Sequence, residues 1–386
     1  MMQSDPHLQD RFIHELVTAL KDFDIQGICL AGSAASDELI WAQDNSGWRL
    51  MSDVEVGVVA ASLKKRRTFK HKAKAIGDRY GYDVEVFLIT PRRLRRGSPK
   101  NLSFRPHSPN VLMYDLIEGA KWLWKKSAFE CRHFSPEQLP PWEGIRLILN
   151  RMGEGAPFLL PWFSGHHVDD EQELKRWVLK LLMAIGDANL IAEKTYTTGY
   201  LKRLVQWQKT ASGLQHIGAT TKETIASAYL TRRNGGFQLD DYSPPEIREA
   251  AISSIKYLLD LHCGALPPST SSAAMRSLDE WCMFFKKHPI PVRYQAPVRY
   301  LDGMYDSLFT LPAIIKAHLT RLPIEALKNG VPIQIIGYGI IASALIPDEE
   351  NTNNHLRHHL QNYFQSSDSA VVLGRQLRNI WDATCK

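Results

Sequence analysis

The chain has few cysteines, and their arrangement argues against two common kinds of structural site. None of them forms a CxxC pair or stands at a Cys/His spacing typical of zinc ligands. Their number is odd, which argues against a closed disulfide framework and is typical of proteins in a reducing compartment. We therefore expect a cytoplasmic protein. The cysteines are Cys29, Cys131, Cys263, Cys282 and Cys385.

Long apolar segments are also lacking. The longest apolar stretch, residues 331–347, contains Gln334 and has a proline near each end. A helix that crosses a bilayer needs about 20 apolar residues. The first ten residues lack the basic and then apolar pattern of a secretory signal. The sequence therefore predicts no membrane span and no membrane partner.

Positive charge is concentrated in one part of the chain. Residues 61–126 contain 17 Lys and Arg against 5 Asp and Glu, whereas the whole chain has a net charge of only +6. Such a segment favours a polyanionic partner, such as a nucleoside triphosphate or a nucleic acid. The run of four basic residues at 64–67 is by itself more typical of a solvated helix face.

Length and composition indicate a globular protein with more than one domain. The 386 residues, of which 44% are apolar and 23% charged, suggest two or three domains. A segment rich in proline at residues 136–141 is the predicted boundary. We expect a first domain over residues 1–135 that mixes strands and helices, and a mainly helical domain over residues 136–386.

Acidic pairs stand at the start of two of the three apolar runs predicted to be strands. Asp53 and Glu55 flank the start of one run, and Asp83 and Glu85 repeat that spacing in the next. Residues two apart in a strand point to the same face, so each pair projects side by side. Clustered carboxylates repel one another, and a divalent cation relieves that repulsion. The predicted strands are Ile25–Ala31, Val54–Ala60 and Val84–Ile89.

The first predicted strand ends at Gly32 and Ser33. Glycine has no Cβ and lets the backbone approach a phosphate closely. Ser33 adds a hydroxyl and a backbone N–H. If residues 34–41 begin a helix, its first N–H groups also point toward the anion. The turn is therefore a candidate phosphate-binding segment.

Three features together resemble the nucleotidyltransferase superfamily, which has the polymerase-β-like fold. They are a glycine-serine turn after a strand, an Asp-x-Glu pair and a third carboxylate on a later strand. The resemblance covers residues 10–126. It implies an α+β fold in which an N-terminal mixed sheet with helices is followed by a mainly α-helical C-terminal domain. In this superfamily such a helical domain commonly shapes the acceptor site.

The resemblance also implies a reaction and its residues. Gly32 and Ser33 would bind the triphosphate of an NTP, and Asp53, Glu55 and Glu85 would be the catalytic residues and the ligands of Mg²⁺ or Mn²⁺. A nucleoside monophosphate would pass to an acceptor hydroxyl, and pyrophosphate would leave.

Glu85 is preferred to Asp83 as the third carboxylate. Both residues alternate onto one strand face, so periodicity does not separate them. Asp83 stands at the entry of the strand, where an acid is easily solvated. Glu85 stands between Val84 and Val86, where an acid is costly without a partner.

Residues 34–52 make the spacer before the acidic pair longer than is usual in the superfamily. Turn-forming residues at 45–47 lie between Trp41 and Trp48, which predicts an inserted hairpin. We expect the two tryptophans to face each other across it.

Several polar residues of the helical half are candidates for the acceptor side of the cleft. Lys180 and Asp187 lie seven apart on one predicted helix, and a position on the helix surface is favoured over one in the cleft. The stretch with His166, His167 and residues 169–171 has metal-ligand residue types without a known spacing, and we interpret it as a polar loop. Further candidates are Arg146, Asn150, Arg151, Tyr196, Tyr200 and Arg203.

A G-x-G-x-x-A pattern at residues 337–342 follows an apolar run, but no acid-ended second strand follows it. We therefore interpret it as a buried element and not as a dinucleotide site. The remaining elements are predicted as helices at residues 6–23, 63–80, 111–119, 142–152, 174–194, 248–262 and 278–287, and a strand at residues 120–124.

Two other functions stay open at this level. One is a catalytically inactive nucleotide-binding or regulatory protein of the same fold, and the other is a basic RNA-binding protein. The acceptor is also open between a small molecule, which we slightly favour, a protein side chain, an RNA end and a second nucleotide.

Overall fold

The computed structural model describes residues 6–263 except 40, 45–46, 51, 62–65, 92–93, 95–109, 127–130, 132, 134 and 235–241, and in addition Arg378. Its fold is α+β, as the sequence predicts. A four-stranded mixed sheet has the strand order β5-β4-β1-β6. Strands β4 and β5 run parallel, and β1 runs antiparallel to both β4 and β6. The strands are β1 Ile25–Ala31, β4 Val54–Ala60, β5 Val84–Ile89 and β6 Lys121–Lys125.

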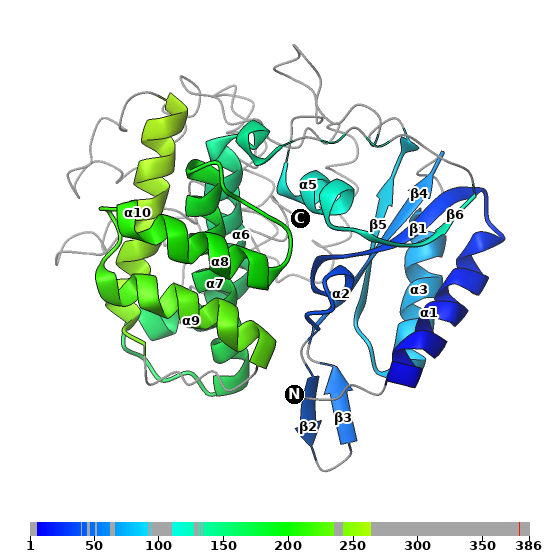
Figure 1. Ribbon diagram of the computed structural model, residues 1–386. Helices are drawn as coiled ribbons and strands as arrows, with labels where there is room; N and C mark the ends of the chain where they lie inside the picture. Colours follow the sequence, from blue (N-terminus) through cyan, green and yellow to red (C-terminus); the bar gives the residue numbers. More distant parts are fainter. Residues whose placement is uncertain are drawn as a thin grey trace, which may run out of the picture.

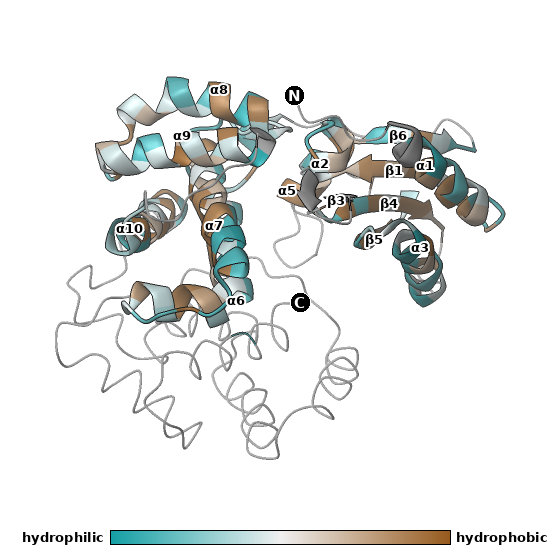
Figure 2. Cartoon of the chain, turned by 90° about the horizontal axis from the view of Figure 1, so that it is seen from below, coloured by the Kyte–Doolittle hydropathy of each residue, from teal (hydrophilic) through white to brown (hydrophobic). Residues whose placement is uncertain are grey.

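Two helices cover one face of the sheet (Figure 1). They are α1, Pro6–Lys21, and α3, Arg66–Tyr80, which connects the parallel strands β4 and β5. A parallel connection needs such a crossover, because the chain must return to the same end of the sheet. Phe12, Leu16 and Phe69 are among the helix residues buried against the strands. The strands β1 and β4 are apolar along most of their length, whereas α3 turns many polar residues outward (Figure 2).

Helix α5, Val111–Glu118, belongs to the core on the opposite face of the sheet. Its first turn is capped by Asn110, whose Oδ1 accepts a hydrogen bond of 2.9 Å from the N–H of Met113. Leu116 shares one apolar core with Cys29 of β1 and Val59 of β4. That core continues from α5 into the following helices, so the sheet and the helical half are packed together.

The helical half follows a short 3₁₀ helix, Pro136–Gln138. Helices α6 and α7 make its most extensive packing, and α5 lies between the helices and the sheet (Figure 1). Among the described residues, no helix has the length and apolar character to cross a membrane. The helices are α6 Pro141–Phe163, α7 Glu171–Ala192, α8 Tyr200–Thr210, α9 Ala219–Asn234 and α10 Pro244–Cys263.

Six of the seven helices expected from apolar periodicity lie in the described residues and are present. Helix α6 continues to Phe163 through Pro157 and Pro161, beyond the predicted end. Helices α8 and α9 were not predicted, and α9 has few large apolar residues on its buried face. The predicted helix at residues 278–287 and the glycine pattern at 337–342 lie outside the described residues. The division into domains at residue 135 stays a prediction.

The inserted stretch forms a two-stranded hairpin, as predicted, of β2, Trp41–Asp44, and β3, Gly47–Leu50. The expected pairing of its tryptophans is wrong. The register sets Trp41 opposite Leu50 and Trp48 opposite Gln43. The two tryptophans are therefore offset by two residues along the ladder, because the register is set by the pairing of Asp44 with Gly47 at the turn.

Arg203 on α8 connects the helices to α5 through buried ion pairs. Its Nη1 donates to Asp187 Oδ2 of α7 at 2.9 Å, and its Nη2 donates to Asp115 of α5 at 3.2 Å. Its Nε donates to the carbonyl oxygen of Thr197 at 2.8 Å. Tyr229 of α9 donates to the other oxygen of Asp187 at 2.7 Å. The favoured surface position of Asp187 is therefore wrong, since packing of α8 and α9 against α7 buries it.

We expect the variant Arg203→Met to lose about 3–5 kcal/mol of unfolding free energy, because it leaves two buried carboxylates without their cation. Urea unfolding measures this loss. The control is Lys121→Met, which removes an exposed ion pair with Asp37 and should cost at most about 1 kcal/mol. Equal losses of unfolding free energy in the two variants would contradict the stabilising role assigned to the buried ion pairs of Arg203.

Candidate functional site

Three carboxylates converge at one edge of the sheet. Asp53 and Glu55 stand at the start of β4, and the register pairs Glu55 with Glu85 of the parallel strand β5. One oxygen from each of the three residues lies within 4.8 Å of the others. Among the described residues this is the only group of acidic, His or Cys side chains close enough to hold a metal ion.

Asp83 does not belong to this group. Its side chain is exposed, and its carbonyl oxygen accepts a hydrogen bond of 2.7 Å from the N–H of Val54. This bond belongs to the first pair of the parallel strands, Val54 with Val84, so Asp83 stands just before β5 begins. The group therefore contains Glu85, the residue preferred from the sequence.

Gly32 and Ser33 lie directly beside the acids. The antiparallel register pairs Ala31, the last residue of β1, with Glu55. Gly32 has a φ of +55°, and a Cβ at this position would collide with the carboxylate of Glu55. Only glycine therefore suits both the backbone conformation and the close approach. Ser33 follows as a buried residue in the four-residue helix α2, Gly32–Ala35.

The environment of Glu55 disfavours its charged form. Burial raises its pKa, the negative charges of Asp53 and Glu85 raise it further, and the result is a pKa of about 7. An all-oxygen group of three acids, one of which resists ionisation, fits a hard divalent cation such as Mg²⁺ or Mn²⁺. A bound cation would remove the repulsion that raises this pKa.

Asp53 is held in its charged form by cations of the helical half. Burial by itself would raise its pKa, but the positive charge of Lys180, a backbone hydrogen bond and the positive charges of Arg232 and Arg151 together outweigh burial, and the pKa lies below its usual value. Lys180 is on α7, Arg232 on α9 and Arg151 on α6. Three helices therefore direct positive charge toward the acids on the sheet.

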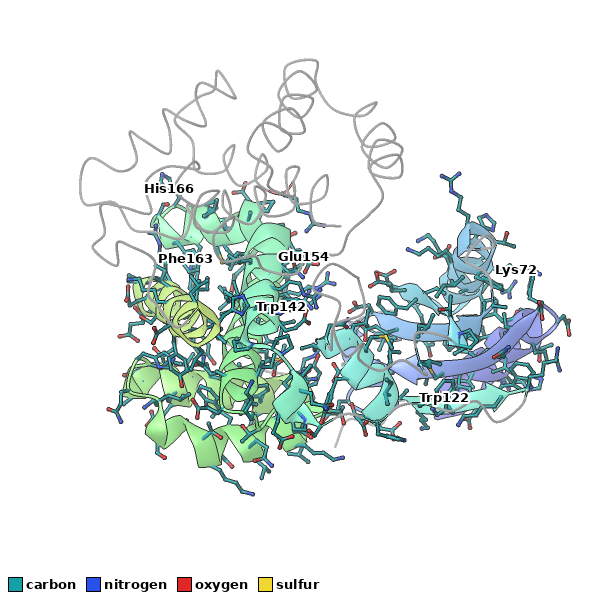
Figure 3. All side chains as sticks on the ribbon, turned by 90° about the horizontal axis from the view of Figure 1, so that it is seen from above. Lys72, Trp122, Trp142, Glu154, Phe163 and His166 are labelled. Carbon is teal, nitrogen blue, oxygen red and sulfur yellow. The ribbon has the colours of Figure 1, made fainter. Side chains whose placement is uncertain are left out.

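Each of these cations is itself partly or fully buried. Burial lowers the pKa of Lys180 to about 8, and the nearby charge of Arg151 acts in the same direction. Arg151 forms an ion pair with Glu154. Figure 3 shows Glu154 on the flank of α6 nearer to the sheet. Arg232 is buried, and its Nε has no hydrogen-bond partner within the described part of the chain. A buried donor without a partner is costly, and an anionic ligand would satisfy it.

The helical residues named from the sequence have mixed outcomes. The preferred surface position of Lys180 is wrong, because α6 packs along α7 and its Arg151 lies beside Lys180. Tyr196 and Arg203 are buried in the ion-pair network and do not form a polar edge. Arg146 pairs with Glu143 of its own helix.

The predicted polar loop covers residues 166–170, whereas Glu171 already belongs to α7, which begins earlier than the predicted residue 174. His166, His167 and Asp169 are exposed or partly so, and Asp170 caps α7 by accepting from the N–H of Glu173 at 3.0 Å. Arg232 was missed by sequence reasoning. Its helix was not recognised, and a single arginine carries no signal without its spatial neighbours.

A comparison with models of protein families gives no match to this chain, and neither curated proteins nor solved structures give one.

We expect the unfolding free energy of the metal-free protein to fall as pH rises from about 4.5 to about 7. Over this window folded Glu55 keeps a proton that the unfolded chain has lost, so the folded state binds more protons and loses stability with rising pH. In EDTA at pH 8 the variant Glu55→Gln should therefore be more stable than wild type by about 1–3 kcal/mol, and at pH 4.5 the difference should disappear.

Chemical denaturation at the two pH values measures this effect. The control is Asp83→Asn just before the neighbouring strand, which replaces an exposed carboxylate outside the acid group. A variant Glu55→Gln that is less stable than wild type at pH 8 in EDTA would contradict the assigned repulsion.

Proposed function

We propose that this chain is a metal-dependent nucleotidyltransferase, which transfers a nucleoside monophosphate from an NTP to an acceptor hydroxyl and releases pyrophosphate. The proposal agrees with the resemblance to the nucleotidyltransferase superfamily. The proposal is carried by one observation: three clustered carboxylates on the sheet lie opposite three partly or fully buried cations on the helices. A metal-bound triphosphate has the charge distribution that fits between them.

Asp53, Glu55 and Glu85 would hold two Mg²⁺ or Mn²⁺ ions, whose oxygen preference the three carboxylates match. When bound, such ions supply charge stabilisation to both the attacking and the leaving oxygen of an in-line displacement. Glu85 lies at the edge of the sheet, on the strand farther from the glycine-serine turn. It would therefore lie nearest to the acceptor hydroxyl and help to take its proton.

The remaining residues would bind and orient the triphosphate. Gly32 keeps the turn free of a side chain, and Ser33 offers its hydroxyl and N–H to a phosphate oxygen. Lys180, Arg151 and Arg232 would neutralise charge on the phosphates that leave as pyrophosphate. Guanidinium groups suit this role because they donate two parallel hydrogen bonds to a phosphate.

We expect Asp53→Asn to abolish transfer and Glu85→Gln to reduce it by at least about a hundredfold, because each removes a ligand for the transition-state charge. The measurement is incubation with each α-labelled NTP, Mg²⁺ or Mn²⁺ and cell extract, scored for pyrophosphate and for labelled product. Asp83→Asn is the control and should keep wild-type activity. Separation of the product by size distinguishes a small-molecule acceptor from a protein or an RNA.

Two outcomes would redirect the proposal. Metal-dependent NTP binding without turnover in any extract would favour the catalytically inactive alternative. Full activity of the variant Asp53→Asn would show that the acid group takes no part in the reaction.

We expect Lys180→Met to raise the Kd for a metal–NTP complex at least about tenfold, because a charge-assisted hydrogen bond to phosphate is worth about 1.5–3 kcal/mol. Calorimetric titration with a non-hydrolysable NTP measures the Kd. The matched control is Lys175→Met on the same helix, where Lys175 pairs with Glu171 at 2.6 Å. Similar effects of the two substitutions would show that Lys180 has no specific contact with the nucleotide.

A further inference from the structure

The segment that follows the glycine-serine turn contacts helix α8 through a single carboxylate. Glu38 Oε2 accepts a hydrogen bond of 2.7 Å from the N–H of Tyr200, and Oε1 accepts one of 2.9 Å from the N–H of Leu201. These are the first two N–H groups of α8, which have no partner within the helix. A carboxylate at this end is further favoured by the helix dipole.

The local sequence of α8 leaves this capping role to Glu38. The residue before the helix is Gly199, which has no side chain to cap it and adopts a φ of +82°. A Cβ at Gly199 would lie 3.5 Å from Ser36 Cβ and 3.6 Å from Glu38 Oε2. Both are ordinary van der Waals distances, so glycine is favoured here by its positive φ and not by a lack of space.

The same segment is hydrogen-bonded back to the candidate phosphate-binding turn. The N–H of Glu38 donates to the carbonyl oxygen of Ser33 at 2.8 Å. The hydroxyl of Ser36 lies 3.1 Å from the carbonyl oxygen of Gly32 and 2.8 Å from Glu38 Oε2. Glu38 is thus one or two hydrogen bonds away from both residues of the turn.

At its other end the contact leads to the cations of the helical half that act on the acids. Tyr200, whose N–H binds Glu38, has two guanidinium groups over its ring, Arg203 at 5.2 Å and Arg232 at 5.4 Å from the ring centroid. Arg232 is the buried cation that acts on Asp53 and has an Nε without a hydrogen-bond partner in the described part of the chain. A continuous series of contacts therefore runs from Gly32 and Ser33 to Arg232.

We propose that Glu38 is a positioning residue for the nucleotide phosphates, which fixes the Gly32-Ser33 turn and the Arg232 guanidinium at one separation. The proposal rests on the proposed function, because it assigns both groups to the same triphosphate. Glu38 itself does not contact the acids. Its loss leaves α8 attached to α5 through Arg203 and Asp115, so the fold persists while the first turn of α8 is released.

The test compares two ligands, Mn²⁺ alone and tripolyphosphate with Mg²⁺, in calorimetric titrations of the full chain. The variant Glu38→Ala should raise the Kd for magnesium tripolyphosphate at least fivefold and leave the Kd for Mn²⁺ unchanged within twofold, because the Glu38 carboxylate is hydrogen-bonded to α8 and Ser36 and not to the acid group. Glu38→Gln keeps one acceptor oxygen and should give an intermediate Kd. The matched control is Asp37→Asn, whose carboxylate pairs with Lys121 of β6 and not with α8.

The outcomes separate this proposal from the proposed function. The proposed function is supported if the wild-type protein binds magnesium tripolyphosphate and the variant Asp53→Asn does not. If Glu38→Ala then binds tripolyphosphate as tightly as Asp37→Asn, or loses Mn²⁺ and tripolyphosphate affinity together, the positioning role is overturned and the function stands. Wild type that binds no tripolyphosphate with Mg²⁺ overturns both.

Discussion

The arrangement of this protein depends on the burial of Arg203 between carboxylates from two parts of the chain. Asp115 belongs to α5, which packs on the sheet, and Asp187 belongs to α7 in the helical half. Burial disfavours the charge of both carboxylates and raises the pKa of Asp115 to about 6, so a single cation that serves both is strongly retained. This pairing fixes the orientation of α8 and, through Tyr229, of α9.

Orientation of these helices decides which charges face the sheet. The strands present carboxylates, because Asp53, Glu55 and Glu85 stand where β4 and β5 pair. The helices present ammonium and guanidinium groups, and these lower the pKa of Asp53 although burial alone would raise it. Carboxylates on the strands face cations on the helices, and the buried Nε of Arg232 has no hydrogen-bond partner among the described residues. A metal-bound polyphosphate can satisfy both features.

Much of the sheet could be predicted from local pattern. The apolar runs at β1, β4 and β5 contain β-branched residues, and the spacing of Asp53 and Glu55 places them on one face whatever surrounds them. Glu85 belongs to the acid group, as preferred from the sequence, but it is exposed like Asp83, so its pairing with Glu55 in the register, and not burial within the run, places it there. The register of the inserted hairpin did not follow, because strand pairing at its turn decides whether Trp41 and Trp48 are opposite or offset.

By itself the sequence determined the strands, the paired acids and the glycine-serine turn after the first strand, since each depends on neighbours within a few residues. The close approach of Gly32 to Glu55 depends on the pairing of β1 with β4. Tertiary structure alone decided that Lys180, Arg151 and Arg232 act on Asp53, because residues on three helices meet only after those helices pack. It also decided that Asp187 is buried and that Glu38 caps α8, a contact across more than 160 positions of the chain. The physical reason is range: periodicity constrains the direction of a side chain from its own element, whereas the groups it meets are set by the packing of elements remote in sequence.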